Sequence, residues 1–470
     1  MSAESPVRNP QSEIPNPRFP ENLRGKSVIV LGAGRSGRAA AALLARSDAK
    51  VTIADDYLTS IDPEQFEPIV ASHVQMVLGT VRPELASETD AVVVSPGVRL
   101  THPLVARARE RGLPVVGELE LSGRFARAPI VAVTGTNGKT TTVHWIAHLL
   151  RKGGKSAVVC GNVGTPLGDV VSQKPDWFVV EVSSYQLETI ERFHPSVAVV
   201  LNLTPDHLER HPTADDYLAV KARITENQQA DDTLVLNADD GSVWSVGTKT
   251  AATVWGFSLS RPLDQGVFVE NGEIDICEAP GSTIHSLLRT REISLPGSHN
   301  LANALASVAA VCVCGLGFDA IQAGLKDFPG VEHRIERVRE HRGVQYINDS
   351  KATNLASLKV ALLSFDRPIL LIAGGRGKGA PYEPLVPLIA SRVCQLIVFG
   401  EEAARMEAAW GSHVPTQRVT NMAEAVEKGA QLARPGEIVL LSPACASFDM
   451  YRNFEERGRH FKELVMRLED

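Results

Sequence analysis

The sequence has few cysteines and no cysteine pair of the kind that holds a metal or carries redox chemistry. The six cysteines among 470 residues form no CxxC pair. Only Cys312 and Cys314 lie close together, and because they fall in an apolar helical run we expect buried thiols there. Such cysteine usage is typical of a reducing compartment.

Long apolar runs and long basic runs are also missing. No segment approaches the roughly 18 consecutive apolar residues of a transmembrane helix. Lys and Arg total 48 against 55 Asp and Glu, a net charge of −7 without a basic run, which argues against nucleic acid or an anionic membrane as a partner. The N-terminus is proline-rich and has no signal-peptide core, so residues 1–22 are expected to form a disordered tail. We expect a soluble, cytoplasmic protein.

The most informative feature that is present is a glycine-rich turn from Gly135 to Thr141. It follows one apolar run and opens an amphipathic run, so it lies where a strand becomes a helix. Backbone N–H groups in such a turn approach phosphate oxygens, and the helix N-terminus favours negative charge. Lys139 is predicted to reach the β- and γ-phosphates and Thr140 to offer its hydroxyl to Mg²⁺. Val133 stands where the standard motif has its first glycine, so a plain Gly-Asn-Gly turn is the alternative. The context favours a nucleoside triphosphate.

Three α/β blocks are predicted after the tail, at residues 23–117, 118–330 and 331–470. In the first, a strand at Ser27–Leu31 runs into the GxGxxG turn Gly32–Gly37, followed by a helix and a second strand. This is a Rossmann-type start with Asp55 near the place where a ribose hydroxyl is met. NAD binding is one interpretation, but a lone GxGxxG serves any nucleotide diphosphate, and the nucleotide stays open at this point.

The central block alternates strands and helices, which predicts a mostly parallel sheet. Its strands are expected at Ser156–Val159, Trp177–Val182, Val197–Leu201 and Thr233–Leu236. Glu181 and His207 follow strand ends, where such folds place ligands.

Each polar residue of this block has an alternative interpretation. Glu181 is alternatively a solvated strand end. The i, i+4 pair His207 and His211 suggests zinc, but no HExxH glutamate is present and Pro212 interrupts the helix. From its position on an amphipathic helix alone, Lys221 is interpreted as a surface lysine.

The third block carries polar clusters after several predicted strands. The strands are Val344–Ile347, Ile369–Ala373, Leu396–Phe399 and Ile438–Leu441, and the clusters are residues 348–354, 374–378 and 442–447. All three clusters are expected at one sheet edge. The cluster Gly374–Lys378 suggests a second phosphate loop, but Pro381 and Pro384 leave no clear helix start, so a cationic carboxylate site is an equal alternative.

Together these segments resemble the Mur ligase family. The resemblance runs from about Lys26 to the C-terminus and rests on VTGTNGKTTT, EVSSYQLE, NLTPDHLERH, YLAVKARITEN, LPGSHNLANALA, EHRIERV, INDSKATN and SPACASFDMYRNFEERG, in that order. EVSSYQLE, INDSKATN and SPACASFD narrow it to the members that add D-glutamate. The resemblance implies three α/β domains: a Rossmann-like UDP-substrate domain, a central P-loop ATPase-type domain and a C-terminal Rossmann-like domain.

The resemblance also implies roles for individual residues. ATP would be held by Gly135, Thr136, Asn137, Gly138, Lys139, Thr140, Thr141, Asn300, Asn303, Arg334 and Asp349. The UDP end of the substrate would meet Arg35, Ser36, Asp55 and Gly97, with Asn162 at the diphosphate. D-Glutamate would be bound by Lys351, Thr353, Lys378, Ser447 and Phe454. Two Mg²⁺ ions would be served by Thr140, Glu181, His207 and Lys221 as its CO₂-derived carbamate. The catalytic set would be Lys139, Glu181, His207 and Lys221.

The implied activity is ATP-dependent ligation of D-glutamate to a UDP-linked acceptor in peptidoglycan synthesis, and hence in cell-wall biogenesis, cell shape and division. The acceptor's carboxylate would become an acyl phosphate, the third block would close over the second, and the enzyme would act as a monomer. The alternatives are a sister ligase or a folylpolyglutamate synthase-like enzyme using another amino acid, an NAD-dependent oxidoreductase, and a non-catalytic nucleotide switch.

Overall fold

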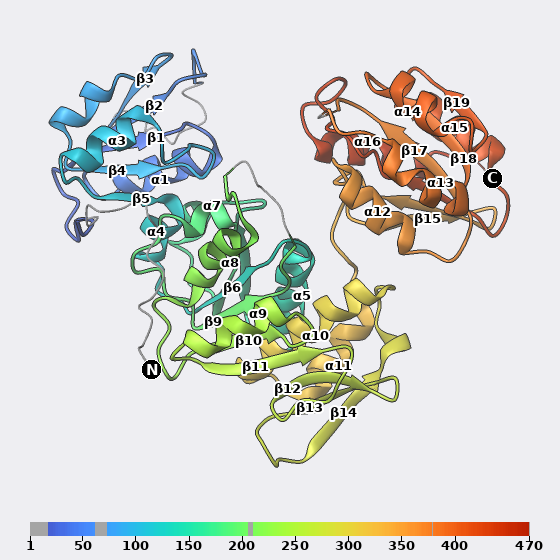
Figure 1. Cartoon of the computed structure of the whole chain (residues 1–470), viewed down its shortest axis with the longest axis horizontal. Coiled ribbons are helices and arrows are strands. Elements are labelled where there is room, and N and C mark those ends of the chain that lie inside the picture. Colours follow the sequence, from blue (N-terminus) through green and yellow to red (C-terminus); the bar gives the residue numbers. More distant parts are fainter. Residues whose placement is uncertain (1–16, 62–72, 205–209, 378, 470) are drawn as a thin grey trace. The chain divides into compact units, whose positions relative to one another are not determined.

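The described chain forms three sheets within two compact units. A computed structural model describes residues 17–61, 73–204, 210–377 and 379–469. The first unit is Met1–Thr290 with Ala302–Leu325, and the second is Arg291–Leu301 with Lys326–Asp470. Sheets of five and nine strands lie in the first unit and a sheet of six strands lies in the second (Figure 1). The expected α/β architecture with three sheet-bearing parts is confirmed.

The five-stranded sheet is parallel throughout, in the order β3-β2-β1-β4-β5. Its strands are β1 (Ser27–Leu31), β2 (Lys50–Asp55), β3 (Val74–Leu78), β4 (Ala91–Val94) and β5 (Val115–Gly117). Its helical segments are α1 (Arg35–Ala45), the 3₁₀ turn η2 (Pro83–Glu88), α3 (Pro103–Glu110) and α4 (Glu118–Gly123).

The nine-stranded sheet has the order β14-β13-β12-β11-β10-β9-β6-β8-β7. Pairing is parallel from β7 to β12 and antiparallel for β13 and β14. The strands are β6 (Ile130–Thr134), β7 (Ala157–Gly161), β8 (Trp177–Glu181), β9 (Val197–Val200), β10 (Thr233–Asn237), β11 (Thr253–Ser258), β12 (Gly266–Glu270), β13 (Glu273–Cys277) and β14 (Ile284–Arg289). The helical segments are α5 (Lys139–Lys152), α6 (Leu167–Val170), α7 (Ser184–Leu187), α8 (Ala214–Ala222), η3 (Arg223–Thr225), α9 (Gly241–Ser245), η4 (Val246–Lys249), η5 (Thr290–Glu292), α10 (Ser298–Val313) and α11 (Phe318–Asp327).

The six-stranded sheet has the order β15-β16-β20-β17-β18-β19, with only β15 antiparallel to its neighbour. The strands are β15 (Glu336–His341), β16 (Val344–Asn348), β17 (Ile369–Gly374), β18 (Val393–Phe399), β19 (Thr416–Arg418) and β20 (Ile438–Leu441). The helical segments are α12 (Leu355–Leu363), η6 (Glu383–Leu385), α13 (Val386–Arg392), α14 (Ala403–Trp410), α15 (Met422–Leu432) and α16 (Phe454–Met466).

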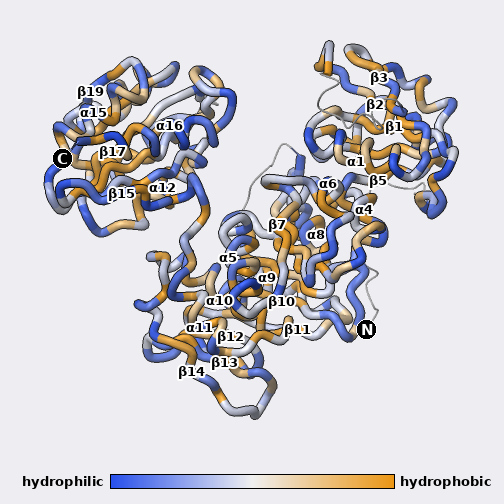
Figure 2. The backbone as a smooth tube through the Cα atoms, turned by 180° about the vertical axis from the view of Figure 1, so that it is seen from behind, coloured by the Kyte–Doolittle hydropathy of each residue, from blue (hydrophilic) through white to orange (hydrophobic). Residues whose placement is uncertain are grey.

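Continuous apolar runs explain why these strands are central in their sheets. Every residue of β4, β6 and β17 is buried, as expected of parallel strands covered by helices on both faces. Figure 2 shows the hydrophobic residues concentrated along the strands of each sheet. Because these cores fix the strands, the polar loops that leave the strand ends start from fixed positions.

The structure corrects the expected end of the N-terminal tail. Residues 17–22 were assigned to a disordered tail, yet Phe19 is only 1% exposed and belongs to the core around β1. Its ring lies under the guanidinium of Arg124 at 5.4 Å, and its N–H donates to Glu191. The buried ring, together with contacts to Arg124 and Glu191, docks this segment. The rest of the expected tail, residues 1–16, lies outside the described residues.

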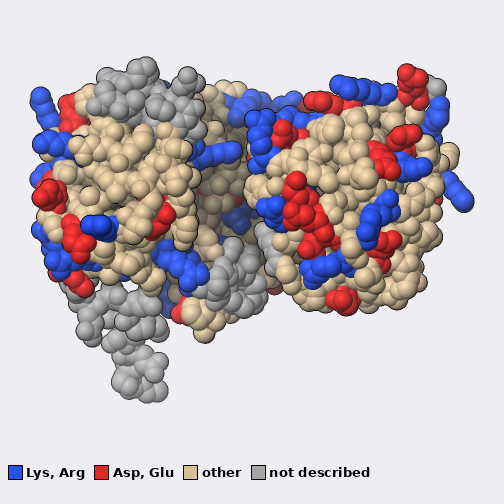
Figure 3. Space-filling view, turned by 90° about the horizontal axis from the view of Figure 1, so that it is seen from above, with Lys and Arg blue, Asp and Glu red and all other residues tan. Residues whose placement is uncertain are grey.

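Membrane spans, surface charge and thiols can be described for the residues that the structure covers. None of the helices there is long and apolar enough to cross a membrane. On the face shown in Figure 3, acidic and basic side chains are interspersed. All six cysteines are free thiols, although Cys312 and Cys314 are half-buried and not fully buried as expected.

Candidate active site

The glycine-rich turn has the strand–turn–helix geometry that the sequence predicted. It joins β6 to α5, and Gly138 is the residue preceding the helix, with a φ of +86°. A Cβ atom on Gly138 would lie 2.2 Å from Oδ1 of Asn303. Glycine is therefore required here both by the left-handed backbone and by the close approach of α10.

Side chains hold this loop in one conformation. Lys139 Nζ donates to the carbonyls of Gly135 and Thr136, each at 2.8 Å. Asn202 binds Asn137 on both sides, accepting from its N–H at 2.9 Å and donating to its carbonyl at 3.1 Å. Asn202 was not identified from the sequence, although it opens the quoted segment NLTPDHLERH. These contacts fix the backbone of the turn between β6 and α5.

Oxygen donors converge beside the loop. The hydroxyl of Thr140 donates to Oε2 of Glu181 at 2.8 Å, and the amide of Asn162 donates to Oε1 at 3.0 Å. Glu181 is 2% exposed, so it is not the solvated strand end of the alternative interpretation. A buried carboxylate next to a hydroxyl is a donor set that suits Mg²⁺, which prefers oxygen ligands.

Lys221 lies at the same loop. It is 1% exposed, and its Nζ donates to the carbonyl of Gly135 at 3.0 Å and to Oγ1 of Thr134 at 3.3 Å. The ammonium also lies 4.6 Å from the centre of the Tyr217 ring. The interpretation of Lys221 as a surface lysine is therefore wrong. His207 lies outside the described residues, whereas His211 is buried, with Nε2 3.1 Å from Ser184 Oγ.

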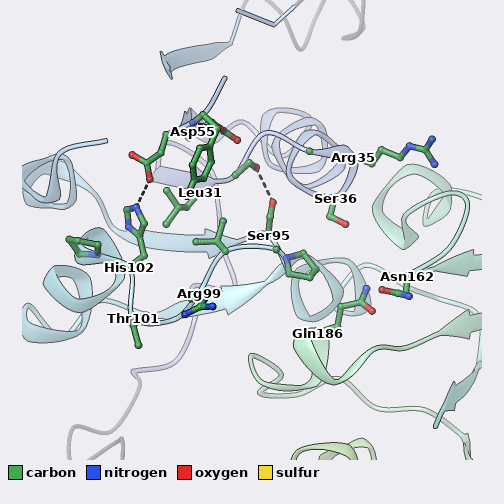
Figure 4. A pocket seen from close by; sticks show the side chains of 18 residues that line it. Leu31, Arg35, Ser36, Asp55, Ser95, Arg99, Thr101, His102, Asn162 and Gln186 are labelled. Carbon is green, nitrogen blue, oxygen red and sulfur yellow. Dashed lines mark hydrogen bonds and ion pairs between the residues drawn. The ribbon is translucent and has the colours of Figure 1, made fainter. Parts of the chain in front are cut away.

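A cavity of about 670 Å³ opens in the first unit (Figure 4). Its lining includes all five residues expected at the UDP end, namely Arg35, Ser36, Asp55, Gly97 and Asn162. The volume lies within the ~300–1,000 Å³ typical of small-molecule sites. Asn162 lines the cavity and also binds Glu181, so the cavity and the oxygen cluster share a residue.

The carboxylates at the cavity are fixed by backbone and side-chain donors. Burial raises the pKa of Asp55, but N–H groups of Ala33, Tyr57 and Leu58 outweigh it and hold that pKa below its usual value. Asp56 accepts from Val81 N–H and pairs with His102 at 2.7 Å. The Asp56–His102 pair was missed by the sequence reasoning because the two residues are 46 positions apart.

In the second unit, Asp349 is a buried carboxylate with several donors. Ser442 Oγ donates to its Oδ2 at 2.8 Å and Ile335 N–H to its Oδ1 at 3.2 Å. Burial raises the pKa of Asp349 to about 7, and the nearby Arg334 guanidinium opposes that rise. Nε of Arg334 is buried with no hydrogen-bond partner among the described residues. A ligand oxygen would satisfy it.

The three polar clusters of the third block do lie at one sheet edge, because they follow the adjacent parallel strands β16, β20 and β17. Arg376 and Ala446 exchange two backbone hydrogen bonds between two of the loops. Arg457, fully buried, donates to Ser350, Cys445 and Ala446 and thus joins the first loop to the last. Arg457 was missed because nothing in the sequence of α16, which carries several charged residues, distinguishes the one arginine that is buried.

The residues expected to bind D-glutamate are placed as follows. Lys351 Nζ lies 5.7 Å from the centre of the Phe454 ring, and Thr353 N–H donates to the Lys351 carbonyl. Ser447 is buried, and its carbonyl accepts from Met450 and Tyr451. Lys378 lies outside the described residues. Among the described residues, the first helical segment after Gly374–Gly377 is η6, which disfavours a second phosphate loop.

The two asparagines of α10 are both buried. Asn303 lies against the glycine-rich turn, with its Oδ1 3.4 Å from the hydroxyl of Thr142. Asn300 donates to the carbonyl of Pro296 at 2.7 Å.

One further acidic cluster has metal-like spacing, formed by Glu332, His333 and Glu336. The ammonium of Lys462 pairs with both glutamates, at 3.0 Å and 2.5 Å. The cluster thus already contains its own counter-charge, and we assign no metal to it.

Comparison with known proteins decides the family. Residues 26–117 match the MurD-like N-terminal domain of Mur ligases, residues 133–311 the Mur ligase middle domain, and residues 333–445 the glutamate ligase domain of Mur ligases. A protein of Pelotomaculum thermopropionicum named UDP-N-acetylmuramoylalanine--D-glutamate ligase is 44% identical over 447 residues, covering 94% of this chain and 98% of its own. The chain belongs to the Mur ligase family. A second relative of the same name, from Acidobacterium capsulatum, is 40% identical over 446 residues, covering 94% of this chain and 97% of its own.

Solved structures agree at the level of the fold. UDP-N-acetylmuramate-alanine ligase of Thermotoga maritima matches this Mur ligase with a TM-score of 0.58 and 20% identity, covering 94% of this chain and 99% of that one. MurF of Acinetobacter baumannii matches with a TM-score of 0.59 and 16% identity, covering 88% and 91%. The fold of the family is therefore shared by members whose sequences have diverged widely.

Proposed function

We propose that this Mur ligase is a UDP-N-acetylmuramoylalanine--D-glutamate ligase, which joins D-glutamate to UDP-N-acetylmuramoyl-L-alanine at the expense of ATP in peptidoglycan precursor synthesis. The observation that carries the proposal is identity of 40–44% to relatives of that name across 94% of the chain. The cavity and the loops described above support the proposal, because they carry groups of the kinds that such a reaction needs.

The glycine-rich turn is the proposed ATP phosphate site. Lys139 would exchange its two loop carbonyls for phosphate oxygens, which are stronger acceptors for an ammonium. Thr140 and Glu181 are the proposed ligands of one Mg²⁺, supported by their buried, adjacent oxygens. The bound metal ions would neutralise phosphate charge during transfer. Asn300, Asn303, Arg334 and Asp349, with the loop residues Gly135, Thr136, Asn137, Gly138 and Thr141, complete the proposed ATP set.

Lys221 and His207 are the proposed residues at a second Mg²⁺, with Lys221 in its carbamate form. The fit rests on the burial of Lys221 and on its position at the carbonyl of Gly135. An ammonium there would repel a divalent cation, whereas a carbamate is an anionic oxygen ligand of the kind that Mg²⁺ prefers.

The cavity in the first unit is the proposed site of the UDP portion. Arg35, Ser36, Asp55 and Gly97 would surround the uridine end and Asn162 the diphosphate, supported by their shared presence in the lining. This assignment replaces the NAD interpretation of the GxGxxG turn. Lys351, Thr353, Lys378, Ser447 and Phe454 are the proposed D-glutamate set.

The chemistry follows from the weak reactivity of a carboxylate. The L-alanine carboxylate attacks the γ-phosphorus of ATP, and ADP leaves with the electron pair of the broken P–O bond. The resulting acyl phosphate is attacked by the neutral amine of D-glutamate, and the tetrahedral adduct collapses with loss of phosphate. The chain's role is to bind both partners, orient them and hold Lys139 beside the transferring phosphoryl group.

A panel of amino acids tests this proposal. Phosphate release from ATP is measured with Mg²⁺ and UDP-N-acetylmuramoyl-L-alanine, adding D-glutamate, L-glutamate, L-alanine, L-lysine or diaminopimelate in turn. We expect steady turnover with D-glutamate alone. Faster turnover with another amino acid would identify a sister ligase. The companion proposal of a cytoplasmic monomer is tested by light scattering after size exclusion and by fractionation of cells.

A further inference from the structure

Arg210 connects the wall of the UDP cavity to the central part of the first unit. Its NH1 donates to the carbonyl of Pro96 at 2.9 Å, and its NH2 donates to the carbonyl of Val98 at 3.2 Å. These two carbonyls bracket Gly97, and all three residues line the cavity. The Arg210 side chain thus binds the backbone of the Pro96–Val98 loop, which lines the cavity.

The same guanidinium also contacts the segment after β8, through Glu188 and Tyr185. Nε donates to Oε1 of Glu188 at 2.8 Å and NH2 to Oε2 at 2.5 Å. The guanidinium carbon lies 4.3 Å from the centre of the Tyr185 ring. Both side chains of the ion pair are only 12% exposed. Gln186, between Tyr185 and Glu188, lines the cavity too.

Only arginine can make this set of contacts. Four of its five N–H groups are used, two for the carboxylate and two for the carbonyls, in a fixed planar arrangement. A lysine ammonium has three donors around one atom and cannot reach a carboxylate and two separate carbonyls at once.

We propose that Arg210 is a positioning residue for the UDP-linked substrate: it fixes the Pro96–Val98 loop against Tyr185 and Glu188, so that the cavity keeps its shape before the substrate binds. The inference rests on the proposed function, which names the ligand of the cavity. Arg210 touches no reacting atom. Its loss removes the arginine's donors from two half-buried carbonyls and from the Glu188 carboxylate, so the loop is no longer fixed beforehand and binding must order it.

The test compares Arg210→Ala, Arg210→Lys and Glu188→Gln with a matched control, Arg223→Ala. Arg223 also binds this segment, through the carbonyls of Leu187, Glu188 and Ile190, but no described contact joins it to the Pro96–Val98 loop. Calorimetric binding of UDP-N-acetylmuramoyl-L-alanine without ATP gives the dissociation constant, steady-state kinetics give KM and kcat, and circular dichroism checks the fold.

We expect both Arg210 variants to weaken binding of the UDP-linked substrate about ten- to hundredfold, the range set by losing charge-assisted hydrogen bonds. Glu188→Gln, which keeps the shape, should weaken it less. KM for D-glutamate and affinity for Mg-ATP should stay within about twofold. Arg223→Ala should bind the UDP-linked substrate like the wild type, and millimolar guanidinium should partly restore that binding in Arg210→Ala. Such rescue separates positioning from a general loss of structure.

Several results would overturn the inference. Unchanged binding in Arg210→Ala would do so, as would full function of Arg210→Lys. An equal loss in Arg223→Ala would trace the effect to the 187–190 segment and not to the bridge. If the wild-type protein failed to bind the UDP-linked substrate at all, the proposed function would fall first, and the inference with it.

Discussion

Replacing Asp349 by asparagine should stabilise the second unit at alkaline pH while it damages ATP use. Asp349 is 4% exposed, and burial raises its pKa from the usual 3.8 to about 7. In the unfolded chain the carboxyl ionises near pH 4, whereas in the folded chain it keeps its proton to about pH 7. The unfolded state therefore binds fewer protons in this interval, and stability must fall as pH rises through it.

The size of the effect follows from the two pKa values. A rise from 3.8 to about 7 costs at most about 4 kcal/mol of folding free energy once the pH exceeds 7, at ~1.4 kcal/mol for each tenfold change. The neutral amide of Asp349→Asn avoids this cost. The stability difference between the variant and the wild type should thus grow from pH 4 to pH 8, by an amount up to that figure.

Hydrogen exchange of peptides from β16 and β20 measures this locally, which avoids treating several domains as one two-state transition. Ser442→Ala removes a donor to the carboxylate of Asp349, so it should raise the folded-state pKa of Asp349 and extend the loss of stability to higher pH. Asp239→Asn is the opposite control: burial raises the pKa of Asp239, but donors from Ser260, Ser258 and Leu259 outweigh it and lower the pKa. Because the folded-state pKa of Asp239 lies below the ordinary 3.8, that variant should be less stable than the wild type by a constant amount above about pH 4, and this deficit should shrink only below that pH. Peptides of β10 and β11 report it. A pH-independent difference between Asp349→Asn and the wild type would refute the reasoning.

Four other variants test the site. Gly138→Ala should lower kcat/KM for ATP at least about tenfold, because a side chain at φ +86° is strained and meets Asn303; normal ATP kinetics would contradict the loop assignment. Lys221→Ala should nearly abolish ligation with its circular dichroism unchanged, and acetate should restore part of the activity, whereas full activity without acetate would eliminate the carbamate. Ser447→Ala and Lys378→Ala should raise the KM for D-glutamate about ten- to hundredfold with little change for ATP; a rise confined to ATP would instead support a phosphate loop at Lys378.

The central strands could be predicted from the sequence because burial on both faces leaves a continuous apolar run. β1, β4 and β20 have the bounds that the sequence predicted, and β8 ends one residue earlier than predicted. Most edge strands gave no such signal, the exception being β7, which was expected at Ser156–Val159. β3 has a half-exposed pattern without strict alternation, and β13 and β14 form an antiparallel extension whose pairing depends on turn geometry and not on apolar runs. The same holds for β15 and β19 at the edges of the third sheet.

Among the site residues, those on the loops after central strands were accessible to sequence reasoning. The glycines and the lysine of Gly135–Thr141 predict a phosphate loop, because few other structures require this spacing of glycine and lysine between a strand and a helix. Residues that act through contacts distant in sequence were not accessible. Arg210 meets Pro96 across 114 positions, and Arg457 meets Ser350 across 107. From the sequence alone, each of these two residues would be interpreted as an ordinary surface arginine.

Lys221 shows why burial of charge is the more telling signal at this site. On α8 its neighbours include several polar residues, and the helix has no strong apolar face to indicate which side is buried. The fold nevertheless takes its ammonium out of water and leaves it on a carbonyl, a hydroxyl and an aromatic face. Burying a cation is unfavourable for folding, so the position of Lys221 is not explained by a gain in stability. Glu181 and Asp349 are buried in the same way, each at the end of a parallel strand. Two buried carboxylates at strand ends, and a buried ammonium that reaches the end of β6 from α8, lie where ligands bind in α/β sheets, which argues that their positions are kept for binding and chemistry.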